Sequence, residues 1–371
     1  MRLIYSPDKF GYYTVGDYKT YSKLEAIELQ NSTGVFPDWN FNDLAFKSID
    51  WTQEPSIDLW NLYKARARQI RESYDYVVLW YSGGSDSHNI VSSWLDADCK
   101  LDEVATFWNY EGSRDNKDLM NSEPQMVVFD KIKILQEKTD FKFRLIDLTQ
   151  MYLDAVNTKD MLYSMNGRFC VHGFARNLLR EKIEDYQRMI SEGKRLCFVW
   201  GLDKPQIFWD GRHYIQFLDF FGMFLNPYIQ ERYHQGWYDE MFYWSPDMPE
   251  LIIKQAQIVK RFLDTVDDLK FYQNKSTTNG YNPKINKYLK TNTLRSLIYP
   301  RWDLTTFSNG KSNNKVYSQR DEWFWQSNLD EKLKLDSQIK SYLNSIGKYW
   351  INDEYDVSKG VKCHASPRYY L

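Results

Sequence analysis

Short apolar runs alternate with stretches of helical spacing along the middle of this 371-residue chain. Four of these short runs are predicted to be strands, at residues 76–81, 104–108, 141–148 and 195–200. The segments between them, including residues 123–138 and 171–190, place apolar residues on one helical face. This alternation is typical of an α/β fold with a doubly wound parallel sheet. Because ligands of such sheets bind beyond the carboxyl ends of the strands, we expect the loops after these strands to line one crevice.

Both ends of the chain differ from this middle part. Residues 3–15 predict a hairpin that turns at residues 6–9, and residues 22–30 predict a helix that Ser22 caps. Beyond residue 220 the pattern becomes helical, and the helices expected there cover residues 248–263, 286–298 and 323–346. We therefore divide the chain into an N-terminal hairpin–helix prefix, an α/β domain and a mainly helical C-terminal part, with bounds of 1–55, 56–220 and 221–371.

An amphipathic helix is predicted over residues 56–74, ahead of the first strand. Arg66 falls within its apolar stripe, unlike the other basic residues of the segment. A guanidinium at such a position either reaches out to solvent along its apolar stem or pairs with an acidic or phosphate partner. Of these two, we expect Arg66 to reach out to solvent.

A glycine–serine loop joins the first strand to a helix that includes residues 89–95. Two adjacent glycines let the backbone approach an anion closely and adopt φ angles that other residues resist. Serine hydroxyls donate hydrogen bonds, a helix N-terminus favours negative charge, and an aspartate suits Mg²⁺. The sequence therefore predicts a cradle for nucleotide phosphates that consists of Ser82, Gly83, Gly84, Ser85, Asp86 and Ser87.

The stretch from Ser82 to Ser87 resembles the signature loop Ser-Gly-Gly-x-Asp-Ser of the ATP pyrophosphatase (PP-loop) family, which is adenine nucleotide alpha hydrolase-like. Within the family, the synthetase domain of the asparagine synthetases is the most similar. The resemblance implies a HUP-like sheet that binds ATP and Mg²⁺. It also implies a ligase that adenylates a carbonyl or carboxyl oxygen, releases pyrophosphate and forms a C–N bond. The residues beyond 220 would then form the wall that holds the acceptor substrate.

A second loop, at residues 201–205, follows the fourth strand and resembles the corresponding loop of the asparagine synthetases in part. Gly201 and Asp203 match that pattern, whereas Lys204 stands where an acidic residue is usual. The match implies that Asp203 and Asp86 share a Mg²⁺ bound to pyrophosphate, and that Lys204 neutralises phosphate charge. The plainer interpretation is a strand-ending turn with a solvated Asp–Lys pair.

Further candidates lie at the same edge of the predicted sheet. By position alone, the resemblance implies adenine contacts from Phe107 and Trp108, at the end of the second strand. Candidates for substrate or phosphate contacts, each with an exposed or structural role as the alternative, are Arg114, Lys117, Arg168, His172 and Arg176. Residues 207–217 predict a hairpin that turns at Asp210 and Gly211.

Composition and charge restrict the classes of function that fit this chain. The net charge of −2 gives no overall basic field that would attract nucleic acid, although it does not exclude a local basic groove. Aromatic residues make up 17% of the chain, which fits a stacking surface or, as we favour, core filling. No apolar run is long enough to span a membrane, and the four cysteines show no metal-binding pairs. We therefore expect a cytoplasmic protein with reduced thiols and no membrane partner.

We expect no glutaminase activity, because only about 75 residues precede the sheet, too few for the domain that glutamine-dependent relatives carry. Ammonia, an amine or a separate partner protein would then donate nitrogen to a small-molecule or nucleobase acceptor. Three alternatives stay open. They are a sulfur-handling enzyme similar to phosphoadenylylsulfate reductase that uses Cys363, a nucleotide-binding module without turnover, and a member that modifies the bases of RNA or DNA.

Overall fold

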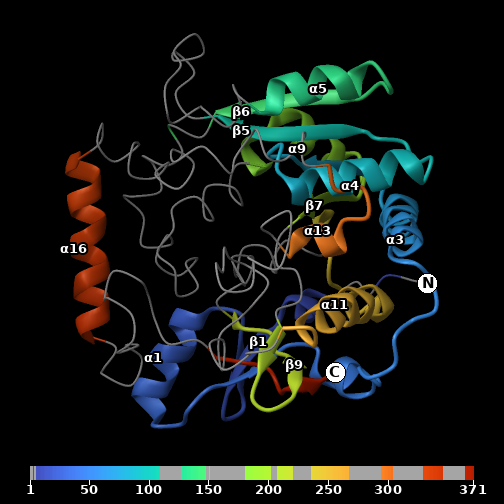
Figure 1. Ribbon diagram of the computed structural model, residues 1–371. Coiled ribbons are helices and arrows are strands. Elements are labelled where there is room, and N and C mark those ends of the chain that lie inside the picture. Colours follow the sequence, from blue (N-terminus) through green and yellow to red (C-terminus); the bar gives the residue numbers. More distant parts are fainter. Residues whose placement is uncertain are drawn as a thin grey trace.

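A five-stranded parallel sheet positions the candidate site (Figure 1). The computed structural model describes residues 3, 6–108, 127–147, 150, 180–201, 207–219, 235–266, 294–303, 329–345 and 364–371. The strands are β4 (Tyr76–Trp80), β5 (Glu103–Trp108), β6 (Lys142–Asp147), β7 (Leu196–Trp200) and β10 (Trp237–Met241). Their spatial order is β10-β7-β4-β5-β6, and every neighbouring pair is parallel. The predictions of an α/β fold and of a parallel sheet are confirmed.

The strand order reverses at β4. Strands β5 and β6 extend the sheet on one side of β4, whereas β7 and β10 extend it on the other side. Connections that leave the carboxyl ends of β4 and β7 therefore run in opposite directions, and sheets of this kind bind their ligands at such a point. The glycine–serine loop follows β4 and lies at this point.

The two faces of the sheet are covered by different helices. On one face Trp80 stacks on Phe107, with ring centroids 4.6 Å apart, and Tyr186 of α9 (Glu184–Ser191) packs edge-on against Phe198. Trp80 also stacks on Phe198, so these rings share that face. Successive strand residues point to opposite faces, and Trp108 accordingly meets α5 (Phe129–Gln136) on the other side. Helices α9 and α5 thus cover opposite faces.

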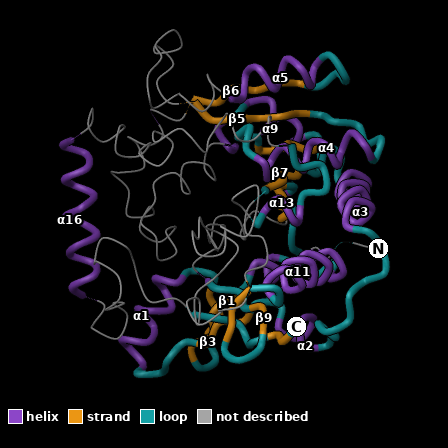
Figure 2. Tube along the Cα trace, in the orientation of Figure 1, coloured by secondary structure: helices purple, strands orange, loops and turns teal. Residues whose placement is uncertain are grey.

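Two further helices flank the first strand in sequence, α3 (Leu59–Ser73) and α4 (Ser85–Asp96). Helix α3 begins after Asp58, whose carboxylate accepts a hydrogen bond from the Asn61 amide at 2.9 Å. This cap satisfies one of the amides that a helix N-terminus leaves without an intrahelical partner. The two helices lie next to each other and confirm the helices predicted around the first strand (Figure 2).

Arg66 of α3 does not reach solvent. Its side chain is fully buried, and Nη2 donates to Glu240 Oε2 at 2.7 Å and to the Met241 carbonyl at 2.9 Å. Glu240 also binds Lys9 at 2.6 Å and accepts a hydrogen bond from Tyr74 at 2.6 Å. The expectation that Arg66 points to solvent is wrong, because its acidic partner lies 174 positions away on an unforeseen strand.

That strand, β10, belongs to the parallel sheet although the sequence predicted only helices beyond residue 220. Asp239 and Glu240 interrupt its apolar pattern, yet both are fully buried. Nη1 of Arg180 lies 2.8 and 2.7 Å from the two carboxylate oxygens of Asp239, and Trp200 Nε1 donates to the same carboxylate at 2.7 Å. A carboxylate can be buried only with such partners. Since the partners lie far away in the chain, the local pattern does not reveal the strand.

The N-terminal residues form a small antiparallel sheet in which β1 (Tyr12–Val15) pairs with β2 (Tyr18–Thr20) and β3 (Asp38–Asn40). The hairpin turns at residues 16–17 rather than at residues 6–9. The latter residues instead enter a 3-10 helix, η1 (Pro7–Phe10), because Ser6 caps it and a proline suits its first turn. The helix predicted over residues 22–30 is confirmed as α1 (Lys23–Thr33), which Ser22 caps.

A second antiparallel sheet joins distant parts of the chain. It consists of β8 (Ile207–Trp209), β9 (His213–Ile215) and β11 (Tyr369–Tyr370), and its hairpin turns at Asp210 and Gly211 as predicted. Nearby, Phe46 of α2 (Asp43–Lys47) stacks on Phe217 at 5.0 Å, and Trp51 stacks on Tyr369 at 5.0 Å. Aromatic side chains from several segments thus fill one core, which confirms the interpretation that we favoured.

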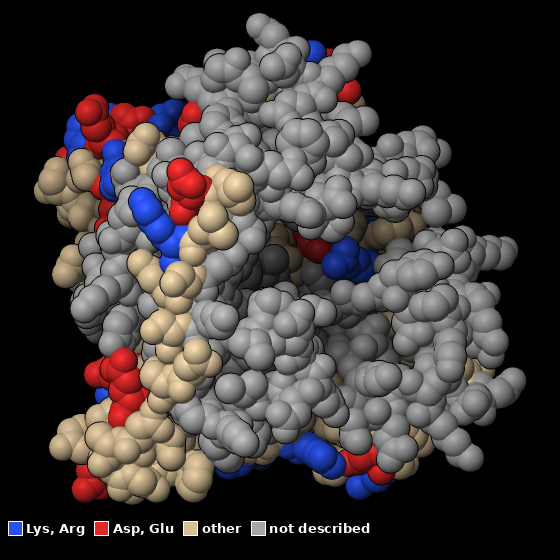
Figure 3. Space-filling view, turned by 90° about the vertical axis from the view of Figure 1, so that its left-hand side faces the viewer, with Lys and Arg blue, Asp and Glu red and all other residues tan. Residues whose placement is uncertain are grey.

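The C-terminal part is less helical than predicted, because it supplies β10 and β11. Helix α11 (Pro249–Leu263) confirms the helix expected over residues 248–263, and α13 (Arg295–Ile298) and α16 (Leu329–Ser345) lie within the other two predicted helices. Among the described residues, no helix combines the length and apolar character that crossing a membrane requires. On the face shown in Figure 3, acidic and basic side chains of the described residues lie intermingled.

Candidate functional site

The loop between β4 and α4 has a conformation that only glycine accommodates. Gly83 adopts φ +67°, in the left-handed region, and a Cβ atom there would lie 2.7 Å from Cγ1 of Val127. Gly84 precedes the first residue of α4, and its carbonyl accepts the first helical hydrogen bond from the His88 amide at 2.9 Å. The backbone at Gly83 is therefore fixed both by its conformation and by the close approach of Val127.

Hydrogen bonds within the loop hold it closed across its base. Ser87 Oγ accepts a hydrogen bond from the Ser82 amide at 3.2 Å and donates to the Gly84 carbonyl at 3.3 Å. Ser85 and Ser87 are both buried, and the Ser87 hydroxyl serves the loop itself in this structure. From α5, Lys131 Nζ donates to the Gly83 carbonyl at 2.8 Å. A cation thus lies directly behind the predicted phosphate cradle.

The N-terminus of α4 faces this loop. The first amides of an α-helix have no partner within the helix, and the helix dipole places partial positive charge there. Gly84, in the N-cap position, has no side chain to satisfy these amides. An anion at this end would accept hydrogen bonds from several amides at once.

Asp86, in the first turn of α4, is held by residues that the sequence analysis did not identify. Its Oδ1 atom accepts a hydrogen bond from the Tyr299 hydroxyl and lies 3.5 Å from Nε of Arg295. Its backbone carbonyl accepts a hydrogen bond from the Tyr243 hydroxyl at 2.5 Å. The carboxylate stays 23% exposed, so it is positioned by the protein and still open to a ligand.

Three buried tyrosines, Tyr63, Tyr243 and Tyr299, form the support behind Asp86. The Tyr63 hydroxyl donates to the Ile298 carbonyl at 2.7 Å, and Asn89 Nδ2 donates to the Tyr243 hydroxyl at 3.2 Å. Burial raises the pKa of each tyrosine well above its usual range, and the charge of Asp86 raises it further. The hydroxyls of Tyr243 and Tyr299 are therefore protonated and can act as donors to Asp86 at neutral pH.

Gly201, at the end of β7, lies against the same helix turn. A Cβ atom at Gly201 would lie 3.0 Å from Cδ1 of Ile90 and 3.5 Å from both the Asp86 carbonyl carbon and the Ser87 nitrogen. The second loop of the sequence analysis therefore begins beside the first one. Asp203 and Lys204, which were predicted to complete the site, lie outside the described residues.

Phe107 and Trp108 lie at the end of β5, where the adenine contacts were predicted. Phe107 stacks on Trp80 on one face of the sheet, whereas Trp108 meets Phe129 on the other, and both are buried. One base could therefore contact the side chain of only one of these two residues. The indole nitrogen of Trp80, at the end of β4, is buried without a hydrogen-bond partner among the described residues.

Arg114, Lys117, Arg168, His172, Arg176 and Cys363 all lie outside the described residues. Within the part of the chain that the structure describes, no group of three or more His, Cys, Asp or Glu residues could hold a metal ion. No protein-family model matches the sequence, and no curated protein matches it. The loop and its surroundings are therefore the features from which a function can be inferred.

Proposed function

We propose that this protein is an ATP-dependent synthetase that adenylates a carbonyl or carboxyl oxygen of an acceptor and then forms a C–N bond. The observation that carries the proposal is the loop from Ser82 to Ser87, which leaves β4 where the strand order reverses and enters the N-terminus of α4. Gly83 has a conformation and a neighbour that demand glycine, as a loop that wraps a phosphate requires. These features, with the strand order, support a HUP-like doubly wound sheet of the PP-loop type.

Cations near the loop favour a polyphosphate ligand. Lys131 holds the Gly83 carbonyl, and Arg295 lies beside Asp86. Charge-assisted hydrogen bonds from such groups are stronger than neutral ones, and a helix N-terminus adds to them. Arg295 is the residue that we expect to approach the phosphates when ATP binds.

Mg²⁺ usually binds nucleotide sites through one or two carboxylates together with phosphate oxygens. The partly exposed carboxylate of Asp86 fits that pattern, with Asp203 as the second carboxylate of the proposal. When bound, the ion would neutralise charge on the leaving pyrophosphate. The Tyr299 hydroxyl fixes the direction of the Asp86 carboxylate for this task.

In the proposed reaction an acceptor oxygen attacks the α-phosphorus of ATP, the bond from that phosphorus to the bridging oxygen breaks, and pyrophosphate leaves. A nitrogen nucleophile then attacks the adenylated carbon, and AMP leaves with the former acceptor oxygen. The protein needs no nucleophile of its own, because positioning and charge neutralisation account for the rate. The nitrogen donor is ammonia, an amine or a partner protein.

Incubation with α-labelled ATP, Mg²⁺ and a metabolite extract tests the proposal. We expect labelled AMP, an equal amount of pyrophosphate, and the loss of one metabolite mass. Asp86→Asn should lower AMP formation by about 100-fold, the usual effect of removing one stabilising group at a transition state. Asp17→Asn makes the same charge change in an exposed turn and should leave AMP formation unchanged.

Other outcomes would replace the proposal. ATP binding without AMP, equal in the wild type and in Asp86→Asn, would indicate a nucleotide-binding module without turnover. Loss of turnover in Cys363→Ser would favour a sulfur-handling enzyme. Retention on RNA or DNA at low salt, lost as salt rises, would favour the modification of nucleobases.

A further inference from the structure

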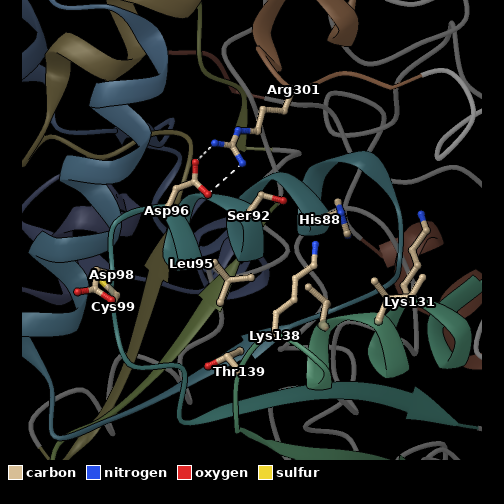
Figure 4. A pocket seen from close by; sticks show the side chains of 12 residues that line it. His88, Ser92, Leu95, Asp96, Asp98, Cys99, Lys131, Lys138, Thr139 and Arg301 are labelled. Carbon is tan, nitrogen blue, oxygen red and sulfur yellow. Dashed lines mark hydrogen bonds and ion pairs between the residues drawn. The ribbon is translucent and has the colours of Figure 1, made fainter.

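A pocket of about 460 Å³ lies between α4, the α5 segment and Arg301 (Figure 4). This volume is in the range of small-molecule sites. Neighbouring helices on one face of a sheet usually bury apolar side chains between them. Here the lining includes His88 and Ser92 of α4, and Lys131 and Lys138 from the α5 side. Polar side chains thus share the space between the helices with the apolar Leu95, Ile134 and Leu135.

The pocket differs in charge from one end to the other. Lys131 and His88 lie toward one end, Asp98 lies at the opposite end, and Lys138 lies between them (Figure 4). A ligand that spans the pocket would therefore meet cations at one end and a carboxylate at the other. This arrangement favours a molecule with an anionic group on one side and hydrogen-bond donors on the other.

Arg301 and Asp96 form one wall and neutralise each other. Arg301 Nη1 donates to Asp96 Oδ1 at 2.9 Å, and Nη2 donates to Oδ2 (Figure 4). The indole of Trp60 donates to the same carboxylate at 3.1 Å and lies under the guanidinium, 4.5 Å from its central carbon. Because this pair is balanced, Lys131 at one end and Lys138 in the middle supply the remaining positive charge of the pocket lining.

The two lysines affect the pKa of the His88 side chain. Burial lowers its pKa to about 4, and the charges of Lys131 and Lys138 contribute to the decrease. The hydroxyl of Tyr81 lies 2.9 Å from Nδ1 and orients the ring. A neutral imidazole beside two ammonium groups leaves the positive potential of this end available to an external anion.

We propose that this pocket binds a sugar phosphate, with the phosphate between Lys131 and Lys138 and the sugar hydroxyls toward Ser92 and Asp98. Lysine ammonium groups bind phosphate as point charges, and a carboxylate and a hydroxyl accept hydrogen bonds from sugar hydroxyls. The site is separate from the cradle for the nucleotide phosphates and does not depend on adenylation. It nevertheless touches that cradle, because the ammonium of Lys131 also donates to the Gly83 carbonyl.

Calorimetric titration of the full chain with ribose 5-phosphate, inorganic phosphate and ribose tests the proposal. We expect ribose 5-phosphate to bind at least about tenfold more tightly than inorganic phosphate, and ribose alone not to bind. Lys138→Gln should weaken the binding of ribose 5-phosphate by about tenfold, since it removes a charged hydrogen-bond donor. Lys138 is preferred to Lys131 because it does not also hold the loop.

The matched control is Lys133→Gln, which makes the same change on an exposed position of α5 outside the pocket. It should bind as the wild type does. Equal binding by Lys138→Gln and Lys133→Gln would overturn the assignment to this pocket, as would loss of binding in Asp86→Asn alone, which would place the ligand at the loop. Equal affinities for phosphate and ribose 5-phosphate would overturn the role of the sugar. Thermal unfolding of each variant verifies that it is folded.

Discussion

The hydroxyl of Tyr299 donates a hydrogen bond to Oδ1 of Asp86, although the two residues are 213 positions apart in the chain. Arg295 approaches the same oxygen from one helical turn earlier. The segment from 294 to 303 is thereby attached to the first turn of α4, directly beside the glycine–serine loop. Any ligand of Asp86 must share this carboxylate with Tyr299 or take its place.

Replacement of Tyr299 by Phe tests this attachment. The substitution keeps the ring and removes the hydroxyl, so we expect the free energy of unfolding to fall by about 1.5–3 kcal/mol, the usual contribution of a hydrogen bond to a charged group. Urea unfolding measures the change. Tyr18→Phe removes a hydroxyl from a residue that is 62% exposed and should stay within about 0.5 kcal/mol of the wild type.

Replacement of Gly83 by Ala tests the geometry of the loop. Gly16 also has a positive φ, of +58°, but a Cβ there would meet nothing within 4 Å. Gly16→Ala should therefore lower the free energy of unfolding by about 1–2 kcal/mol, because the alanine must adopt the left-handed conformation. Gly83→Ala should lower the free energy of unfolding by about 1–3 kcal/mol more than that, because the added methyl group meets Val127, whose side chain is buried and has little rotamer freedom. Denaturant unfolding of both variants, and of Gly83→Ala with Val127→Ala, measures the difference; equal costs would contradict the contact.

The buried ion pair of Arg66 gives a prediction about stability. Arg66→Met leaves Glu240 buried with one cation fewer, so we expect unfolding to become easier by about 3–5 kcal/mol. Lys47→Met removes a cation from a pair in which Lys47 is 57% exposed, and it should change stability by less than about 1 kcal/mol. Similar losses in the two variants would show that burial does not govern the Arg66 pair.

His88 predicts a dependence of stability on pH. Its pKa in the folded protein is about 4, below the ordinary 6.5, so between these values the unfolded chain binds a proton that the folded chain does not. Stability therefore falls as pH decreases, and His88 lowers the free energy of unfolding by about 2 kcal/mol between pH 7 and pH 5. We expect the wild type to lose that much more than His88→Gln over the same range. A His88 resonance that titrates near 6.5 in the folded protein would contradict this.

Local patterns predicted the parts of the fold that are continuous in sequence. β4 and β7 are uninterrupted apolar runs, β5 and β6 are short apolar runs with a few polar positions, and the loop after β4 carries its glycines, serines and Asp86 within six positions. β10 was not predicted, because Asp239 and Glu240 interrupt the apolar pattern of the strand. Only their distant partners allow those carboxylates to be buried in a strand.

For a similar reason, the sequence predicted only those residues of the candidate site that follow one another in the chain. Asp86 stood out beside the glycines, whereas nothing in the sequence marks Tyr243, Arg295 or Tyr299 as its neighbours. These residues reach Asp86 because helices and strands from separate regions pack together, and hydrogen bonds over more than 150 positions leave no local periodicity.

The ion pairs of Glu240 also bear on the order in which the chain can fold. During synthesis Lys9 and Arg66 leave the ribosome long before Glu240, from which they are 231 and 174 positions distant. Contacts between such distant residues form slowly, because the intervening chain must first be brought together. Until β10 arrives, Lys9 of η1 and Arg66 of α3 lack the carboxylate with which they pair in the folded protein, so we expect these two elements to dock late. We therefore expect the N-terminal elements to be held in place only after β10 has emerged, and ribosome-bound chains that stop before residue 237 should be cut readily by proteases at their N-terminal end.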